Sequence, residues 1–368
     1  MKFVFFGLTV TSSWGNGHAT TYRSLLKALA ARGHRIHFIE KDVEWYRSNR
    51  DLPAPEFCTV HLYDDWDGSA RRCVHIARDA DAVVVGSFFP DAISATRLLL
   101  EQGNEIILFY DIDTPVTMAR LRDDGNVEYL DPTLIPHYAA YLSFTGGPLL
   151  REIETRFGSP WAVPFYCSVD SAVYKPTTPR REFQCDLSYL GTYACDRQPK
   201  LERYLNETAR LLPGKRMIVA GPQYPQDIAW PQNVERIIHL SPREHPAFYS
   251  SSRFTLNVTR DDMVAAGYSP SVRLFEASAC SAAILSDDWP GLSEFLTPGQ
   301  EILLPHDAYE VSQILLHMSH EERLRIGLRA RDRILAEHTA EHRAAQFEEI
   351  VERCQPHTHA GMVSASNE

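Results

Sequence analysis

The sequence lacks the signatures of several large classes of protein. Its seven cysteines are odd in number and none lies in a Cys-x-x-Cys pair, which argues against a disulfide framework or a zinc ribbon. No run of about 20 apolar residues is present, so no membrane-spanning helix is expected. Asp and Glu (48) outnumber Lys and Arg (37), giving a net charge of −11. Because proteins that bind nucleic-acid phosphates are usually basic, no nucleic-acid partner is expected.

What is present is typical of a globular enzyme. Hydrophobic residues make up 44% and charged residues 23% of the chain. A length of 368 residues exceeds what one hydrophobic core usually holds, so two domains are expected. Reduced, mostly buried thiols are typical of a cytoplasmic protein. The expected oligomeric state is a monomer or a homodimer.

The first 40 residues alternate between strand and helix patterns. An apolar run at the start is followed by a glycine-containing loop and by a helix that begins at His18. Gly33 stands where the C-terminal cap of this helix is expected, and an extended apolar run resumes at 36–39. A strand, a helix and a further strand in this order predict a right-handed parallel crossover. The apolar positions at helical spacing are Tyr22, Leu25, Leu26 and Leu29.

The same alternation continues and predicts a second unit of the same kind. Capping boxes at 241–244, 307–310 and 319–322 predict helix starts between the strands. We therefore predict an α/β protein of two Rossmann-like parallel-sheet domains facing a central cleft. The remaining strands are expected at 82–85, 105–110, 187–190, 217–220, 254–258 and 282–285.

Composition and pattern also suggest the domain limits. The N-terminal domain is expected at 1–172, a linker rich in Pro, Thr and Arg at 173–183, and the C-terminal domain at 184–336. A C-terminal helix at 337–354 is expected, with packing back on the N-terminal domain as one possibility. A disordered tail is expected at 355–368; its two histidines, His357 and His359, have no further ligand nearby and are discounted as a metal site.

The loop between the first strand and first helix is the first candidate site. Glycines let the backbone approach a ligand closely, and a helix N-terminus offers free N–H groups to an anion. Gly17 is the candidate phosphate contact, and Asn16 beside it is a further candidate. His18 can take a proton near neutral pH; the alternative is that it caps or packs.

A second candidate lies after the strand at 105–110, where Asp111 and Asp113 precede a proline. A carboxylate here can orient His18 or act directly on an acceptor hydroxyl. The alternative is capping of the loop.

The third candidate is the strongest. Ser269 and Pro270 are typical of the start of a helix, on which Arg273 and Glu276 share one face. A helix N-terminus flanked by Arg260 and Arg273 suits a diphosphate, and Glu276 suits ribose hydroxyls. The alternative is a surface Arg–Glu pair. The neighbouring candidates are Ser271 for the diphosphate, together with Tyr268 and Asn257.

A fourth candidate follows the strand at 187–190. A loop glycine and two cations again suit a phosphate, whereas a turn followed by a solvated helix face is the alternative. The residues are Gly191, Thr192 and Tyr193, together with Gly221, for the nucleoside, and Arg197 and Lys200 for the diphosphate.

Together these residues resemble glycosyltransferases of the GT-B fold, and within them the CgeB-like group, whose C-terminal half is of the glycosyl transferases group 1 type. The resemblance covers about residues 1–350, and its most specific motif is Arg-Leu-Phe-Glu-Ala at 273–277. Further matches are the Asp-Thr-Pro motif at 113–115 and the segments 164–170 and 186–193. It implies a nucleotide-diphosphate sugar, most favourably a UDP-sugar, as substrate. It implies binding mainly by the C-terminal domain, an acceptor on the N-terminal side and no obligatory metal or cofactor.

The resemblance also implies roles for the candidate residues. Arg260 and Arg273 would stabilise the departing diphosphate, and Glu276 would hold the ribose. Asn16, Tyr268 and Asn257 would contact the donor sugar or the acceptor. The Gly-His pair at 17–18 resembles inverting members, where the histidine is the base, with Asp113 or Asp111 assisting. The Phe-Glu-Ala helix resembles retaining members, yet Tyr268 stands where many of these have a further glutamate, and Ser281 where relatives often have glycine.

Stereochemistry, sugar and acceptor therefore stay open at this point. Two rival functions also remain: a nucleotide-sugar epimerase of the same fold, and a catalytically silent nucleotide-sugar-binding protein. A DNA-modifying glycosyltransferase is disfavoured by the net charge.

Overall fold

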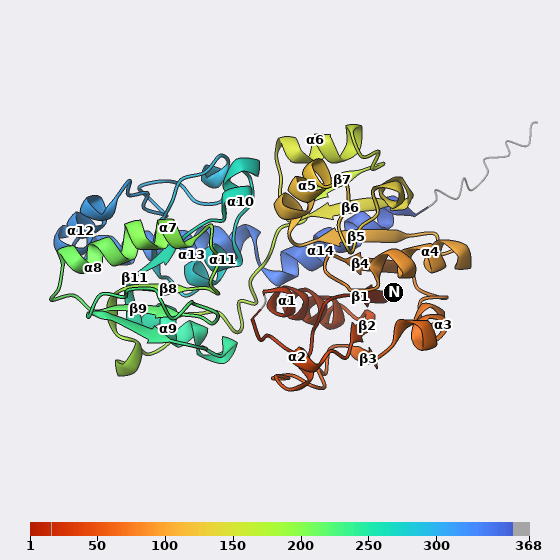
Figure 1. Cartoon of the computed structure of the whole chain (residues 1–368), viewed down its shortest axis with the longest axis horizontal. Coiled ribbons are helices and arrows are strands. Elements are labelled where there is room, and N and C mark those ends of the chain that lie inside the picture. Colours follow the sequence, from red (N-terminus) through yellow and green to blue (C-terminus); the bar gives the residue numbers. More distant parts are fainter. Residues whose placement is uncertain (16, 356–368) are drawn as a thin grey trace, which may run out of the picture.

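The computed structural model describes residues 1–15 and 17–355. Asn16 and the predicted tail beyond Gln355, with His357 and His359, lie outside the described residues. The described chain forms two α/β domains, each built on a parallel sheet, that lie side by side (Figure 1). This arrangement confirms the predicted fold class. No helix among these residues is both long and apolar enough to cross a bilayer.

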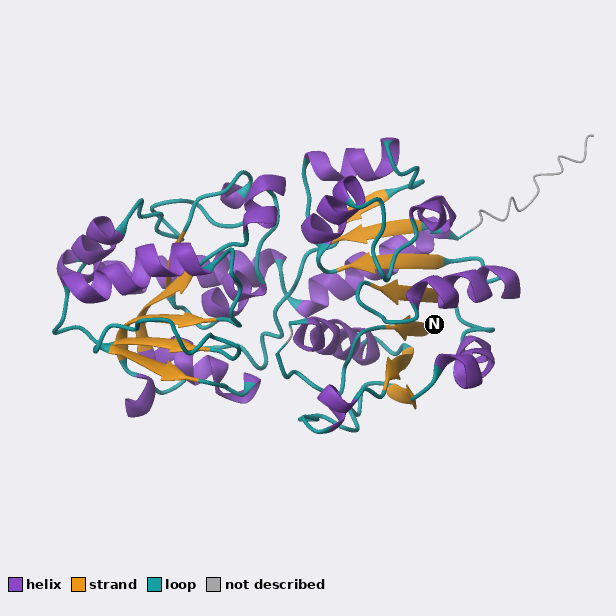
Figure 2. Cartoon of the chain, in the orientation of Figure 1, coloured by secondary structure: helices purple, strands orange, loops and turns teal. Residues whose placement is uncertain are grey.

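The N-terminal domain is built on a seven-stranded parallel sheet of order β3-β2-β1-β4-β5-β6-β7. Its strands are β1 (Lys2–Phe6), β2 (Arg35–Lys41), β3 (Thr59–Tyr63), β4 (Ala82–Gly86), β5 (Ile107–Asp111), β6 (Ala140–Ser143) and β7 (Ala162–Pro164). Its helices are α1 (His18–Ala31), α2 (Glu44–Arg47), α3 (Trp66–Ile76), α4 (Ala92–Gln102), α5 (Thr114–Asp123) and α6 (Pro148–Thr155). Helices cover both faces of this sheet (Figure 2).

The apolar first strand is explained by its central position. Phe3 and Phe5 pack into the core on one face of the sheet, and Val4 and Phe6 into the core on the other. A strand buried on both faces must be apolar throughout, which is why the strand pattern at the start of the sequence is unbroken.

The C-terminal domain is built on a five-stranded parallel sheet of order β10-β9-β8-β11-β12. Its strands are β8 (Cys185–Leu190), β9 (Met217–Ala220), β10 (Val234–Ile237), β11 (Ser252–Asn257) and β12 (Ala283–Ser286). Its helices are α7 (Gln198–Leu201), α8 (Glu207–Leu211), α9 (His245–Ser251), α10 (Asp261–Ala266), α11 (Val272–Ala279), α12 (Ala308–His317) and α13 (His320–Glu337).

The last helix, α14 (Ala340–Cys354), returns to the N-terminal domain (Figure 1). The ring of Phe347 lies 5.1 Å from that of Phe3 and 5.8 Å from that of Phe5. Glu348 pairs with Arg32 and His34. The chain therefore crosses between the domains twice, once after β7 and once before α14, where Val169 bridges to Thr339.

Two predicted helix starts need correction, whereas the caps at Asp307 and Ser319 are confirmed by their hydrogen bonds to the Glu310 and Glu322 amides. At 241–244 the chain forms a short 3-10 turn without a side-chain cap, and α9 begins after it. The helix expected from Ser269 begins at Val272 instead. Contacts with the other domain hold the preceding residues extended, because Ser269 Oγ accepts a hydrogen bond from Thr145 Oγ1 at 2.9 Å.

Candidate functional site

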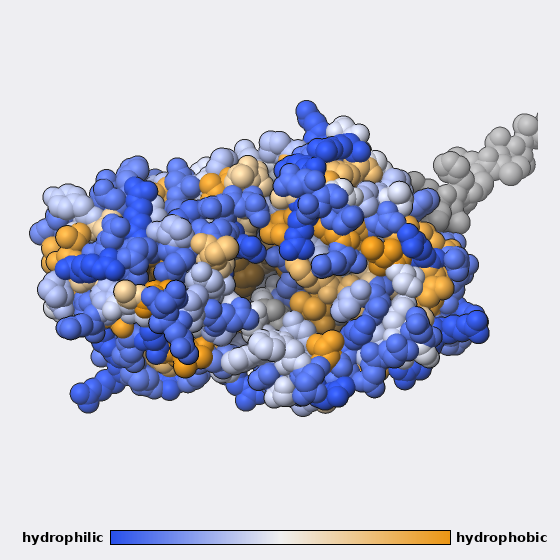
Figure 3. All heavy atoms as spheres, viewed as in Figure 1, coloured by the Kyte–Doolittle hydropathy of each residue, from blue (hydrophilic) through white to orange (hydrophobic). Residues whose placement is uncertain are grey.

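The carboxyl ends of both sheets face a cleft between the domains, where ligands bind in open parallel sheets. Two adjoining cavities, of about 180 and 660 Å³, occupy it, and both are lined by residues from each domain. The space-filling view shows a recess between the two lobes with hydrophobic residues at its base (Figure 3). Gly17, at the N-cap of α1, and Arg273, in the first turn of α11, line both cavities.

Arg273 is buried and held at a fixed orientation. Its Nε donates to the Leu190 carbonyl at 2.6 Å and its Nη1 to Asn257 Oδ1 at 2.9 Å. The guanidinium lies 4.7 Å from the centre of the Tyr189 ring. The other nitrogen, Nη2, lies under Gly191, where an added Cβ would be 2.7 Å away. The Arg273 guanidinium is therefore a cation with a fixed position in the cleft.

Asn257 and Ser271 support this arginine. Asn257 is fully buried, and its Oδ1 also accepts a hydrogen bond from Ser271 Oγ at 2.8 Å. The predicted contact of Asn257 with the donor sugar therefore needs correction, because its amide oxygen is used to orient Arg273. Ser271 stands at the N-cap of α11 and lines the larger cavity.

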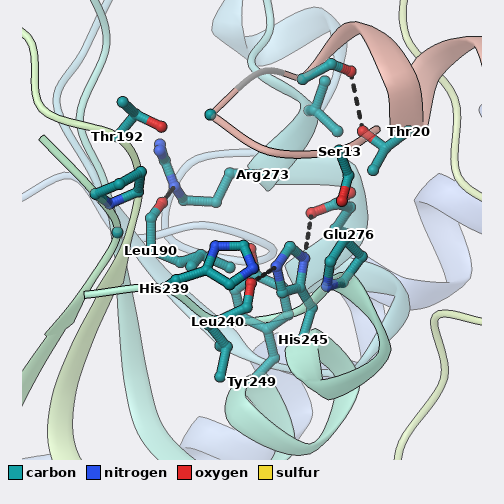
Figure 4. Close-up of a pocket in the computed structure, with 17 residues that line it drawn as sticks. Ser13, Thr20, Leu190, Thr192, His239, Leu240, His245, Tyr249, Arg273 and Glu276 are labelled. Carbon is teal, nitrogen blue, oxygen red and sulfur yellow. Dashed lines mark hydrogen bonds and ion pairs between the residues drawn. The ribbon is translucent and has the colours of Figure 1, made fainter. Parts of the chain in front are cut away.

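The smaller cavity combines a carboxylate with aromatic and imidazole rings. Figure 4 shows Arg273 and Glu276, three residues apart on α11, at this cavity, with the rings of His239 and His245 nearby. Glu276 is only 7% exposed, and its Oε2 lies 3.7 Å from His245 Nδ1. His245 Nε2 lies 3.3 Å from the Leu240 carbonyl oxygen. This cavity can therefore take a ligand with hydroxyl groups at Glu276 and a flat ring beside His239.

Two strand-end loops approach each other at the edge of this cavity. At Gly221, with φ of +141°, an added Cβ would lie 2.0 Å from the Gly191 carbonyl oxygen. Only glycine fits such an approach. Gly191, Thr192 and Gly221 all line the smaller cavity, whereas Tyr193 lines the larger one.

The predicted pair His18 and Asp113 is brought together at the other side of the larger cavity. His18 Nε2 lies 2.8 Å from Asp113 Oδ2, and the Asp113 side chain is 30% exposed against 10% for His18. The second ring nitrogen, His18 Nδ1, is buried and has no hydrogen-bond partner among the described residues. The carboxylate is therefore the more exposed member of the pair, although both residues line the larger cavity. Which of the two accepts the proton stays a prediction.

Asp111 is not in contact with the cleft, so its predicted catalytic role needs correction. It is fully buried and accepts hydrogen bonds from Thr117 Oγ1 at 3.0 Å and from the Asp113 amide at 3.2 Å. Tyr141 Oη lies against its other oxygen. Burial raises the pKa of Asp111 to about 7, and the charge of Asp113 adds to the rise. Asp111 thus supports the backbone that carries Asp113.

This raised pKa predicts a pH dependence of stability. An unfolded aspartate has a pKa near 3.9, so the folded protein binds an extra proton between about pH 4 and 7, and its free energy of unfolding falls as the pH rises through that window. Asp111→Asn resembles the protonated form. This substitution is expected to make the decrease in the free energy of unfolding between about pH 4 and 7 smaller by up to about 4 kcal/mol. Urea unfolding at several pH values measures it. Asp288→Asn, at an exposed carboxylate, is the control; equal pH profiles for Asp111→Asn and the parent would contradict the expectation.

The remaining predicted cations differ in their position. Arg197 and Arg260 line the larger cavity. Arg197 Nη2 donates to the Thr192 carbonyl at 2.6 Å, and Arg260 Nε pairs with Asp196 at 3.3 Å. Lys200 lines neither cavity, because its Nζ is held by the Thr259 carbonyl at 2.8 Å and by Asp261 at 2.8 Å. Its predicted phosphate contact therefore needs correction.

Tyr268 lies at the contact between the domains instead of at the donor sugar. Its backbone has φ of +50°, and its carbonyl accepts a hydrogen bond from the Gly146 amide at 2.9 Å. An added Cβ at Gly147 would lie 2.2 Å from the Tyr268 ring, so the glycine permits the close packing. The prediction of a donor-sugar contact is wrong for this reason. Asn16, the other residue of that group, lies outside the described residues.

Sequence reasoning missed His239, His245 and Tyr249 in the smaller cavity and Phe88 in the larger. His239 follows β10, a strand that was not predicted, so the strand-end rule could not be applied to it. Phe88 follows the strand predicted at 82–85, but nothing in the sequence of that loop indicated which side chain faces the cleft. Among the described residues, no group of three or more His, Cys, Asp or Glu side chains is placed to hold a metal ion.

Part of the chain matches a known protein family. Residues 197–349 match a family model described as glycosyl transferase-like. No curated protein matches the chain. The family model covers most of the C-terminal domain and none of the N-terminal domain. Neither finding singles out the CgeB-like group, so that assignment stays a prediction.

Solved structures match the whole chain at low identity. Sucrose-phosphate synthase from Thermosynechococcus elongatus is 13% identical with a TM-score of 0.68, covering 96% of this chain and 98% of that one. HepE from Anabaena, solved with UDP and glucose, is 12% identical with a TM-score of 0.71, covering 96% and 100%. An alpha-glucosyltransferase solved with UDP-glucose and DNA is 12% identical with a TM-score of 0.67, covering 95% and 98%. The described chain thus has the GT-B fold.

Proposed function

We propose that this protein is a glycosyltransferase that moves a sugar from a nucleotide-diphosphate donor, most favourably a UDP-sugar, to an acceptor hydroxyl. The observation that carries the proposal is the placement of Arg273 and Glu276 on one helix face. Arg273 reaches both cavities, and Glu276 lies one turn further along in the smaller one. A diphosphate and the adjoining ribose need a cation and a hydrogen-bond acceptor at this spacing.

The donor then lies across both cavities. The nucleoside occupies the smaller cavity, with its base beside His239 and its ribose at Glu276. The diphosphate lies between Arg273 and the N-terminus of α1 at Gly17, where the helix dipole adds positive potential. As the bond from the sugar to the diphosphate breaks, these groups stabilise the charge that develops on the leaving oxygen. We propose that this charge is met by the protein and without an obligatory metal ion.

The acceptor approaches from the N-terminal domain. Asp113 accepts a hydrogen bond from the acceptor hydroxyl, and His18 Nε2, at 2.8 Å, holds the carboxylate in place. A positioned proton acceptor of this kind makes the hydroxyl oxygen a better nucleophile. UDP is favoured among nucleotides because HepE and the alpha-glucosyltransferase were solved with UDP or UDP-glucose.

The test is a thermal-shift series with UDP, GDP, dTDP and ADP, each with and without EDTA. A ligand that binds only the folded state stabilises it by about 2.7 kcal/mol at 100 times its dissociation constant. UDP is expected to raise the melting temperature most, with no loss in EDTA. The absence of any shift would contradict donor binding. Conversion of a bound UDP-sugar into its epimer without an acceptor would contradict transfer.

A further inference from the structure

The acceptor side of the larger cavity has an unusual chemical character. The side chains that the N-terminal domain contributes to its wall are largely apolar, and the C-terminal domain adds Met263 opposite them. Among the described residues of the N-terminal domain, the polar side chains that line the cavity are His18, Thr21 and Asp113. The apolar residues of the N-terminal domain are Leu8, Phe88, Ile112, Pro115, Val116 and Phe144.

The charged side chains of the cavity are also unevenly distributed between the two domains. Among the described residues that line the cavity, Arg197, Arg260 and Arg273 all belong to the C-terminal domain, and the N-terminal domain contributes no lysine or arginine. Its acidic side chain among these residues is that of Asp113, which is paired with His18. An anionic acceptor placed against the Asp113 carboxylate would meet repulsion, and no lysine or arginine among the described residues of this wall would offset it.

Phe88 is held at the centre of this wall in a conformation that few such residues adopt. Its φ is +60°, which is strained for a bulky side chain. The loop is fixed because Ser87 Oγ accepts a hydrogen bond from the Ile112 amide at 3.0 Å and the Phe89 amide donates to the Gly86 carbonyl at 3.2 Å. The Phe88 ring lies 5.7 Å from that of His18 and 4.5 Å from that of Tyr129. The fold thus maintains an aromatic surface beside the reacting groups.

We propose that the acceptor is an uncharged, largely apolar molecule, an aromatic or alicyclic ring system that carries the reacting hydroxyl, and not a phosphorylated sugar. Its ring packs on Phe88 and Val116 while its hydroxyl reaches Asp113. Apolar contact supplies the binding free energy, because this wall has few polar groups for a polyol to pair with. The inference rests on the proposed function, since it names the acceptor of the same site.

The test measures acceptor binding on the UDP-saturated protein by isothermal titration calorimetry. The probes are umbelliferone in its uncharged form and glucose 6-phosphate. Umbelliferone is expected to bind at least about tenfold more tightly, and Phe88→Ala to weaken it by about tenfold through loss of the ring contact. Val116→Lys, which adds a cation to the wall, is expected to reverse the preference. Ile93→Lys on α4, which lines neither cavity, is the matched control.

The outcomes separate the two proposals. If UDP does not bind, the proposed function fails. If UDP binds but glucose 6-phosphate binds as tightly as umbelliferone, or Phe88→Ala and Val116→Lys leave the preference unchanged in folded protein, the acceptor inference is overturned while donor binding stands. The melting temperature of each variant, measured first, establishes that it is folded.

Discussion

Arg273→Ala is expected to weaken UDP binding by about 10- to 100-fold and to lower kcat by about 100- to 1000-fold. The first effect is the loss of a charge-assisted hydrogen bond to the diphosphate. The second is the loss of a fixed cation where charge develops as the sugar leaves. Because the side chain is buried and rigidly held by Leu190 and Asn257, it is in place before the donor arrives and does not reorganise during the reaction.

The controls for this variant separate binding from folding. Removing Arg273 leaves the Leu190 carbonyl without this donor, so a loss of about 1–3 kcal/mol of stability is also expected. Each protein is therefore compared with its own melting temperature without ligand. Arg331→Ala removes an arginine that donates to a backbone carbonyl, that of Ala279, and lines neither cavity. Unchanged UDP binding in folded Arg273→Ala would contradict the placement of the diphosphate.

Asp113→Asn is expected to lower kcat by about 100- to 10,000-fold, the range for loss of a positioned proton acceptor. The shape of the side chain is retained, and UDP binding is expected to be unchanged because the proposed contacts of the diphosphate are Arg273 and the N-terminus of α1 at Gly17, and not Asp113. The measurement is release of UDP from the UDP-sugar in the presence of acceptor, together with the UDP thermal shift. A variant with normal turnover would show that the hydroxyl is not held by Asp113.

His18→Gln tests the division of roles within the pair. Glutamine retains an N–H donor toward Asp113 Oδ2, and His18 Nδ1 has no contact with the cavity. A loss of about tenfold is therefore expected, much smaller than for Asp113→Asn. A loss equal to that of Asp113→Asn would restore the imidazole as the base, as the resemblance implied.

The central elements of both sheets could be predicted from the sequence because their patterns are local. β1, β4 and β5 are buried on both faces, and burial on both faces makes a strand apolar along its whole length. The strand-end rule then selected the loops that meet in the cleft, including those of Gly17, Asp113 and Gly191.

The strands that were not predicted, β3, β6, β7 and β10, show the limit of such patterns. β6 is buried but only four residues long, and β7 has only three. β3 and β10 lie at the edges of their sheets, with polar residues such as His61, Glu235 and Arg236. A strand that is only partly buried need not be apolar, so its composition does not distinguish it from a loop. Because β10 was not predicted, the residue that follows it, His239, was not included in the candidate site.

The sequence alone therefore determined which residue types stand at the strand ends and at the start of α11, since these follow from local order along the chain. Only the tertiary structure decided which of them face the cleft. Asp111 and Asn257 are buried beneath the groups they support, Tyr268 packs across the domain contact, and Asp113 is more exposed than His18. These outcomes depend on packing between segments far apart in sequence, for which no spacing or periodicity of the chain carries a signal.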